Sequence, residues 1–160
     1  MSFDKTFFPL TLLAALGCGL MAGIFFAFSA FVMKALSRLP ASEGMAAMQA
    51  INAAILNPLF FAVFFGTLAL CGWAVIVSLW RWHEAGSHYR LAGGALYLMG
   101  GFLVTVAFNV PMNEKLAATH PASPEAAVLW SSYLANWTVW NHVRSVTSLV
   151  AAALLTLALS

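Results

Sequence analysis

The sequence predicts an all-α integral membrane protein in which four transmembrane helices form a bundle, with a short interfacial helix between the first two. Composition is the first observation behind this prediction: 62% of the 160 residues are hydrophobic and only 8% are charged, whereas a soluble domain carries roughly 25% charged residues. The second observation is that the apolar residues stand in long runs, which a soluble core does not require. At this length we expect one transmembrane domain over residues 1–160.

Four apolar runs are long enough to cross a bilayer, for which a helix needs about 20 residues. The predicted spans are approximately 7–33, 58–80, 91–113 and 124–159. The second span opens at Asn57-Pro58, where proline suits the first turn of a helix. The first run is longer than the roughly 7–15 apolar residues of a signal peptide, so we expect it to be retained. The chain is therefore predicted to be a multi-pass membrane protein.

A further segment at approximately 42–56 is too short to cross the membrane. Met45, Met48 and Asn52 recur in this segment at helical spacing and share one stripe. We therefore expect a helix that lies in the membrane interface or folds over the mouth of the bundle.

Glycines give two of the predicted spans a smooth side. The first span contains Gly19 and Gly23, and the third contains Gly93, Gly94, Gly100 and Gly101. Small residues let helices approach closely in membranes, so these faces are expected to pack against helices of the same chain or of a second copy in a homo-oligomer. The net charge of +2 is small and dispersed, so the expected partners are membrane lipid and a small lipophilic molecule, with no nucleic acid.

Polar residues in the predicted spans gather near one interface, on the side of the membrane opposite to the two termini. The second, third and fourth spans and the short helix contribute Asn52, Asn57, Asn109, Asn113, Glu114, Asn141, His142 and Arg144. Polar groups at membrane depth are costly and are candidates for a functional role. The sequence therefore predicts one polar site at this end of the bundle.

The residue types suggest roles within this polar group. His142 titrates near neutrality and suits a proton carrier, together with Glu114. Arg144, Asn109 and Asn113 suit the stabilisation of an oxyanion, as fixed donors do where charge develops. The alternative is structural: an ion pair between Arg144 and Glu114 that ties two helices together, a hydrogen-bonded His142, and asparagines that clamp neighbouring helices.

Aromatic residues precede the polar positions on the fourth span. They are Trp130, Tyr133, Trp137 and Trp140. One interpretation is an aromatic belt at the membrane interface. The other is an aromatic-walled slot for a flat substrate, which would end at the polar group around Asn141.

No cofactor is predicted outright, and haem, quinone and copper stay open. Met33, Met48 and Met112 near the same mouth are soft ligands suited to copper, although methionine is also common filler in apolar packing. The histidine of the polar group suits a haem ligand. Cys18 and Cys71 lie in apolar runs without further ligands at metal-binding spacing, so we interpret them as small packing residues and predict no metal site.

Several motifs, taken together, resemble a known family. The run from Gly19 to Ser29 is followed by Val32-Met33, Met48-Gln-Ala-Ile-Asn52 and Asn57-Pro58, and the later spans contain Asn109-Val-Pro-Met-Asn113 and Trp137-Thr-Val-Trp-Asn-His-Val-Arg-Ser145. This set resembles the bacterial branch of the anthrone oxygenase-like membrane family, from about residue 10 to residue 158. Each motif alone is weak, and the set is specific.

The resemblance implies a four-helix membrane fold and, for a bacterial protein, a place in the inner membrane. Characterised fungal members oxidise anthrones to anthraquinones with molecular oxygen and are described as needing no added cofactor. By position, the polar signature of the family falls on Asn52, Asn57, Asn109, Asn113, Trp140, Asn141, His142 and Arg144. The anthrone itself is not carried over, because bacterial members are widespread outside pigment pathways.

The leading hypothesis is a membrane oxidoreductase or oxygenase that acts on a flat, lipophilic phenol-, anthrone- or quinone-like molecule. His142, Arg144 and Glu114 would be catalytic. The substrate would be bound by Asn52, Asn57, Asn109, Asn113, Tyr133, Trp137, Trp140 and Asn141. The alternative hypothesis is a non-catalytic membrane protein or accessory subunit that binds haem, a quinone or a lipid.

Overall fold

The computed structural model describes residues 7–160, and this part of the chain is helical without any strand. Its elements are α1 (Phe7–Ala27), the π-helix η1 (Phe28–Val32), α2 (Met33–Leu36), α3 (Ala41–Ala54), α4 (Pro58–Trp80), α5 (Ser87–Leu96), the π-helices η2 (Tyr97–Leu103) and η3 (Thr105–Asn109), α6 (Val110–Ala117) and α7 (Ala126–Leu157). The predicted all-α class is therefore confirmed.

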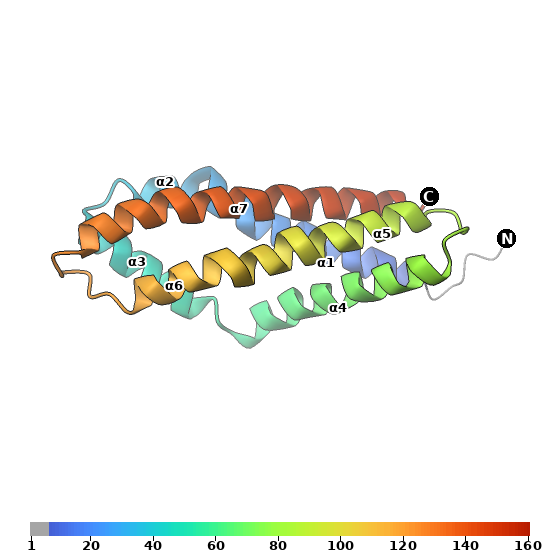
Figure 1. The fold of residues 1–160 in the computed structure, drawn as a ribbon, viewed down its shortest axis with the longest axis horizontal. Helices are drawn as coiled ribbons and strands as arrows, with labels where there is room; N and C mark the ends of the chain where they lie inside the picture. Colours follow the sequence, from blue (N-terminus) through green and yellow to red (C-terminus); the bar gives the residue numbers. More distant parts are fainter. Residues whose placement is uncertain (1–6) are drawn as a thin grey trace.

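These elements make four long columns that lie side by side (Figure 1). The columns are α1 with η1 and α2, then α4, then α5 through α6, and finally α7, which packs against the first and third columns. The beginning of α1, the turn between α4 and α5, and the end of α7 lie together, and we call this the terminal end (Figure 1). The opposite end, with α3, α6 and the beginning of α7, is the site end.

Three of the four columns are long and apolar enough to cross a membrane. They are Phe7–Leu36, Pro58–Trp80 and Ser87–Ala117, so the prediction of a membrane protein is confirmed for three of its four spans. The 32-residue helix α7 is not among them. The physical reason is that Asn141, His142 and Arg144 lower the hydropathy of its central turns.

The short helix α3 closes the site end. Its bounds, Ala41–Ala54, agree with the segment predicted at 42–56. The side chain of Gln49 donates to the carbonyl oxygen of Leu116 in the last turn of α6 and to that of Thr119 just beyond this helix, at 2.7 and 2.9 Å. Met45 and Met48 are buried in an apolar cluster with Trp130 and other residues of this end, and α3 is therefore fixed over the columns.

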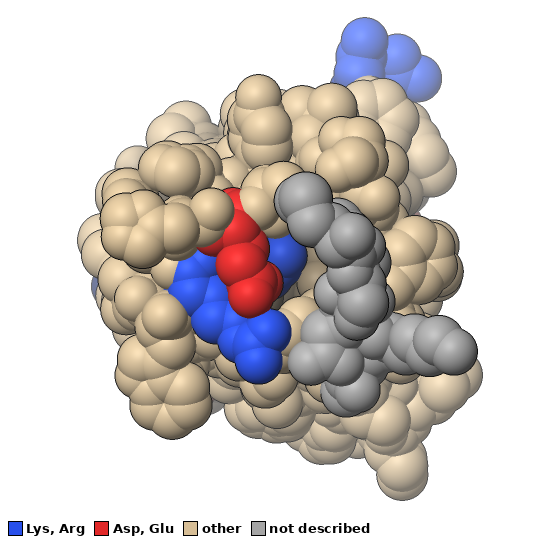
Figure 2. Space-filling view, turned by 90° about the vertical axis from the view of Figure 1, so that its right-hand side faces the viewer, with Lys and Arg blue, Asp and Glu red and all other residues tan. Residues whose placement is uncertain are grey.

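Charged side chains gather near the centre of the terminal end (Figure 2). Arg81 and Glu84 form an ion pair there, with an N–O distance of 3.0 Å. Arg90 is 2% exposed, and its guanidinium lies 5.7 Å from the ring centroid of Phe7. The interior between the two ends is apolar and includes the free thiols of Cys18 and Cys71, whose sulfur atoms lie 3.5 Å apart.

The glycines divide into two groups. A Cβ added at Gly93, Gly94, Gly100 or Gly101 would press against residues of neighbouring elements or turns, whereas one added at Gly19 or Gly23 would meet nothing within 4 Å. The glycines of the third column therefore serve packing within the chain. Self-association through Gly19 and Gly23, which face a groove on the surface of α1 and α7, stays a prediction.

Gly100→Ala is expected to destabilise the protein by about 1–3 kcal/mol, the usual cost of overpacking. The added Cβ would collide with the Cβ as well as the outer atoms of Thr147 on α7, and side-chain rotation cannot move that Cβ away. Gly23→Ala is the matched control. Thermal unfolding in detergent measures both variants, and a wild-type melting temperature for Gly100→Ala would contradict this close helix approach.

Candidate functional site

A cavity of about 100 Å³ lies between the short helix α3 and the four columns. Its walls are mainly apolar, and five polar residues line it: Asn52, Thr105, Asn113, Asn141 and Arg144. Trp137 also lines the cavity. The structure thus brings together part of the polar group predicted from the sequence.

Arg144 places a buried cation at this cavity. Its side chain is 5% exposed; one terminal nitrogen donates to Asn141 Oδ1 at 2.6 Å and the other to Thr105 Oγ1 at 3.3 Å. The guanidinium lies over the rings of Phe25 and Trp137, 4.3 and 5.1 Å from their centroids. Its Nε is buried and has no partner within residues 7–160. The charge is held in place by neutral groups and aromatic faces, and no carboxylate of residues 7–160 pairs with it.

Asn141 links Arg144 to the first column. Its Nδ2 donates to the carbonyl oxygen of Phe25 at 2.7 Å and to Ser29 Oγ at 2.8 Å. Phe25 lies three residues before η1, where π-helical geometry changes the backbone hydrogen-bond pattern. Because the amide donates to α1 and its oxygen accepts from Arg144, Asn141 fixes the guanidinium relative to α1.

Asn113 lines the cavity, and hydrogen bonds fix the orientation of its amide. Its Oδ1 accepts from Tyr133 Oη and from Trp137 Nε1, both at 2.8 Å. The indole N–H is only a donor, so the oxygen of the amide must face it and the Nδ2 group points away from it. Asn52 Nδ2 approaches Tyr133 Oη at 3.5 Å. Asn113 and Arg144 are thus two lining residues that carry N–H groups.

Two residues predicted to be catalytic lie outside the cavity, and this corrects their expected place in one shared pocket. His142 and Glu114 are both exposed, and neither lines the cavity. A helix turns about 100° per residue, so Asn141 and Arg144 share a face of α7 while His142 points away from it. The ion pair between Glu114 and Arg144, which the alternative structural interpretation required, does not form in the described part of the chain.

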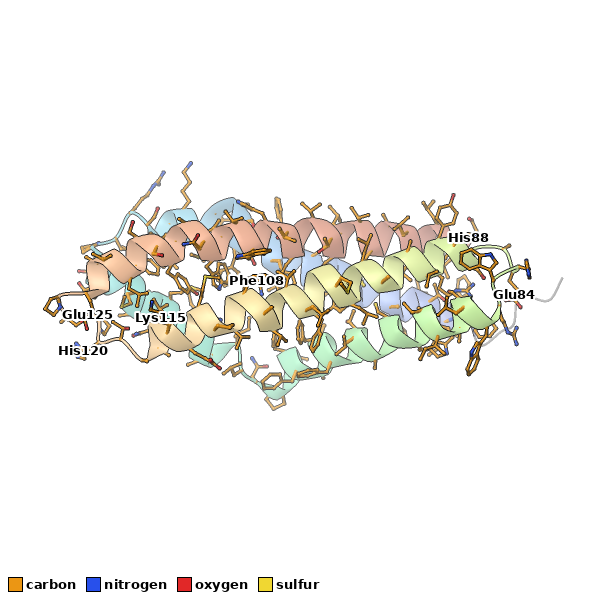
Figure 3. The ribbon with its side chains drawn as sticks, in the orientation of Figure 1. Glu84, His88, Phe108, Lys115, His120 and Glu125 are labelled. Atoms are coloured by element: carbon orange, nitrogen blue, oxygen red, sulfur yellow. The ribbon has the colours of Figure 1, made fainter. Side chains whose placement is uncertain are left out.

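The structure gives three further predicted residues other local contacts. Asn57 is exposed and caps α4 by accepting from the backbone N–H of Phe60 at 3.0 Å. Asn109 is buried and donates to the carbonyl oxygen of Trp137 at 3.3 Å, behind the cavity wall. Trp140 stacks on Phe108, with ring centroids 3.6 Å apart, between the two ends of the molecule (Figure 3).

One interpretation of the aromatic residues was an open slot for a flat substrate. In the structure these side chains fill that space themselves. Trp130, Tyr133 and Trp137 stack in succession along α7 and are 2–4% exposed. They belong to the apolar cluster beneath α3, and of the three only Trp137 lines the cavity. A flat ligand in this cavity would therefore contact one ring of the stripe.

Sequence reasoning did not assign a role to Phe25, Ser29, Thr105 or Ser145. Thr105 Oγ1 donates to the carbonyl oxygen of Gly101 at 2.7 Å, which turns its lone pairs toward Arg144. Ser29 and Ser145 lie 3.3 Å apart beside Asn141. The hydroxyls could have been suspected because they occur in apolar spans, but no sequence signal identifies a backbone carbonyl such as that of Phe25.

The donor set of the cavity does not fit a haem or copper centre. Its lining contains no histidine or cysteine, and Met48 is its one sulfur ligand. Met33 and Met112 pack in the apolar cluster of the site end. Across residues 7–160, no group of three or more His, Cys, Asp and Glu side chains is placed to hold a metal ion.

A comparison with protein families identifies the chain. The family model described as anthrone oxygenase matches residues 59–154, which is more than half of the sequence. The chain belongs to the anthrone oxygenase family. It matches no curated protein and no solved structure. The family resemblance expected from the motifs is thus confirmed, and this anthrone oxygenase-like membrane protein has four of its five polar cavity residues inside the matched region.

The site of this anthrone oxygenase family member combines a cation and amide donors with apolar walls. None of the residues that line the cavity is a histidine or a carboxylate. Such a site stabilises a ligand that arrives with negative charge on oxygen, since an opposite charge nearby favours the ionised form. It offers no side chain of ordinary basicity that would remove a proton inside the cavity.

Proposed function

We propose that the protein is a membrane oxygenase that binds a lipophilic phenol-, anthrone- or quinone-like molecule as its oxyanion and lets this anion react with molecular oxygen. The observation that carries the proposal is Arg144, a buried guanidinium held by Asn141 and Thr105 without an opposing carboxylate. A buried charge that lacks a partner is costly. An anionic ligand supplies the missing partner.

The proposed reaction balances with oxygen as the only oxidant. For an anthrone-type substrate, the enol form loses a proton from its hydroxyl, and the resulting anion transfers electrons to O2. The ring methylene loses two hydrogens and gains one oxygen atom as a carbonyl, and the second oxygen atom leaves as water. Arg144 and the Asn113 amide stabilise the substrate oxyanion while it reacts, as fixed donors do where charge develops.

Stabilisation of the anion removes the need for a base within the cavity. A positive charge within about 4–6 Å of an acidic group favours its ionised form, so a phenolic or enolic proton is released to water as the substrate binds. This account differs from the sequence-based hypothesis, in which His142 and Glu114 take the proton. The catalytic roles of these two residues stay predictions.

His142→Phe separates the two accounts. Because His142 is exposed and outside the cavity, we expect the variant to keep oxygen uptake within about threefold of wild type, whereas a proton carrier contributes roughly 100-fold or more. The measurement is oxygen consumption by purified protein with a panel of anthrones, hydroquinones and phenols. A 100-fold loss would restore His142 as the base. Wild-type protein that binds these anions without consuming oxygen would favour the binding-protein hypothesis.

We also propose that α7 is a fourth membrane span and that the protein resides in the bacterial inner membrane. Support comes from the position of α7, which runs beside the first and third columns over most of their length (Figure 1). Its polar residues Asn141 and Arg144 face inward. These two side chains therefore avoid the free-energy cost of exposing polar groups to lipid. The result would be a bundle of four transmembrane helices.

This topology predicts that the two ends of α7 lie on opposite sides of the membrane. On a background with Cys18→Ala and Cys71→Ala, the cysteines of His120→Cys and Ser160→Cys should react with an impermeant thiol reagent from opposite faces. Both native positions are exposed, and Figure 3 places His120 at the site end. Glu84→Cys, at the terminal end (Figure 3), should react from the same face as Ser160→Cys. Labelling of His120→Cys and Ser160→Cys from one face would contradict the fourth span.

A further inference from the structure

The size of the cavity limits what it can enclose. Its volume is about 100 Å³, whereas pockets that enclose a drug-sized ligand measure roughly 300–1,000 Å³. An apolar cavity of about 150 Å³ holds a benzene molecule. The cavity is smaller than this and accommodates at most one aromatic ring, so the remainder of a larger substrate must lie outside it.

The cavity combines polar and apolar lining residues. Its polar lining residues are Asn52, Thr105, Asn113, Asn141 and Arg144. The two exposed lining residues, Leu56 and Val110, are both apolar, and together with the half-buried Ile24, Ile55 and Phe60 we call them the rim. The side chain of Leu56 is 63% exposed and that of Val110 is 37% exposed. The cavity thus reaches the surface of the molecule through apolar residues.

The rim belongs to surfaces that contact lipid. Ile24, Phe60 and Val110 stand on the three helical segments that are long and apolar enough to cross a membrane. Leu56 lies between α3 and α4, next to the beginning of one of these segments. An opening between Leu56 and Val110 leads into the bilayer, since these two exposed lining residues are apolar and uncharged.

We propose that the substrate is a bilayer amphiphile: a single phenol-type ring, ionised at its oxygen, that carries a long alkyl or isoprenoid chain. The inference rests on the proposed function, because it takes Arg144 as the anion-binding group. The ring and its oxyanion occupy the cavity against Arg144 and Asn113. The chain passes between Leu56 and Val110 and stays in the lipid, so that the cavity need not enlarge to hold it.

The experiment compares two ionised probes in protein reconstituted into lipid nanodiscs. Both are nitrophenols, which are anionic and absorb visible light at neutral pH, and one of them carries a long alkyl chain. Leu56→Trp narrows the exit for the chain. Leu59→Trp is the matched control, because Leu59 is 76% exposed and does not line the cavity.

Leu56→Trp is expected to weaken binding of the chain-bearing probe by about tenfold or more, the loss that corresponds to about two methylene contacts. Binding of the short probe should stay unchanged, and Leu59→Trp should alter neither. Each probe also partitions into the lipid of the nanodisc. This contribution cancels when the apparent affinity of a variant is compared with that of wild type for the same probe. If Leu56→Trp is accommodated by a shift of α3, Val110→Trp narrows the same exit from the other side.

The inference is overturned if both rim variants bind the chain-bearing probe like wild type, or if they weaken both probes equally. Oxygen uptake with chain-bearing and short substrates is measured in the same samples. Absence of uptake from wild type with either substrate contradicts the proposed function, and the chain dependence of binding is then still decided by the probes. If oxygen uptake is equal with both substrates and the rim variants weaken binding of both probes equally, the proposed alkyl or isoprenoid chain of the substrate is contradicted. The proposed function then still stands.

Discussion

Arg144→Met is expected to lower the rate of oxygen uptake by about 100-fold or more, the usual loss when a group that stabilises developing charge is removed. The guanidinium is the one cation that lines the cavity. Methionine fills a similar volume and has no charge to bury, which offsets the loss of the hydrogen bond to the buried Oδ1 of Asn141, so we expect the melting temperature in detergent to stay close to the wild-type value.

Two further variants define what Arg144 contributes. Arg144→Lys keeps the charge and loses the planar fork that bonds Asn141 and Thr105 together, so an intermediate rate is expected. Arg38→Met removes an exposed cation at the site end and controls for net charge. Well-folded Arg144→Met protein that consumes oxygen at the wild-type rate would rule out the proposed oxyanion site.

Asn141→Leu is expected to have the largest effect on stability, a loss of about 2–4 kcal/mol. Asn141 is fully buried, and leucine would leave the Phe25 carbonyl, Ser29 and an Arg144 nitrogen without their partner. Each buried polar group left unsatisfied costs about 1–3 kcal/mol. Unfolding in a detergent titration measures the change, and uptake of oxygen should fall as well because Arg144 is no longer fixed.

The same substitution at Asn136 is the matched control. Asn136 lies on α7 and is exposed, and its side chain bonds only to Ser132 one turn earlier. Asn136→Leu should therefore change the free energy of unfolding by less than about 0.5 kcal/mol. Equal stabilities for the two leucine variants would contradict the role of Asn141 as the link between α7 and α1.

The interior face of α7 could be predicted from the sequence, and this also bears on His142. Trp130, Tyr133, Trp137, Asn141 and Arg144 recur at a spacing of three and four, and all five are buried. His142 does not belong to this stripe. Helical periodicity alone therefore predicts that His142 is exposed. Its proximity in sequence to Asn141 and Arg144 had favoured the hypothesis that it belongs to the same site.

The sequence by itself determined that the protein is helical, where the apolar segments lie and which end carries the polar residues. The physical reason is that a chain in lipid must satisfy its backbone hydrogen bonds internally, and a run of about 20 apolar residues can do so only as a helix. Local signals sufficed for the boundaries too: Asn57-Pro58 starts α4, and the stripe of Met45 and Met48 marks the buried face of α3.

Only the tertiary structure decided which polar groups meet. Arg144 bonds to Thr105, which is 39 positions away, and Asn141 to Phe25, which is 116 positions away, while the nearer candidate Glu114 is exposed. These pairings depend on how the columns are rotated about their axes and on the π-helical turns at Phe28–Val32 and Thr105–Asn109. Rotation and bulges are set by the summed packing of many side chains, so no local pattern encodes them.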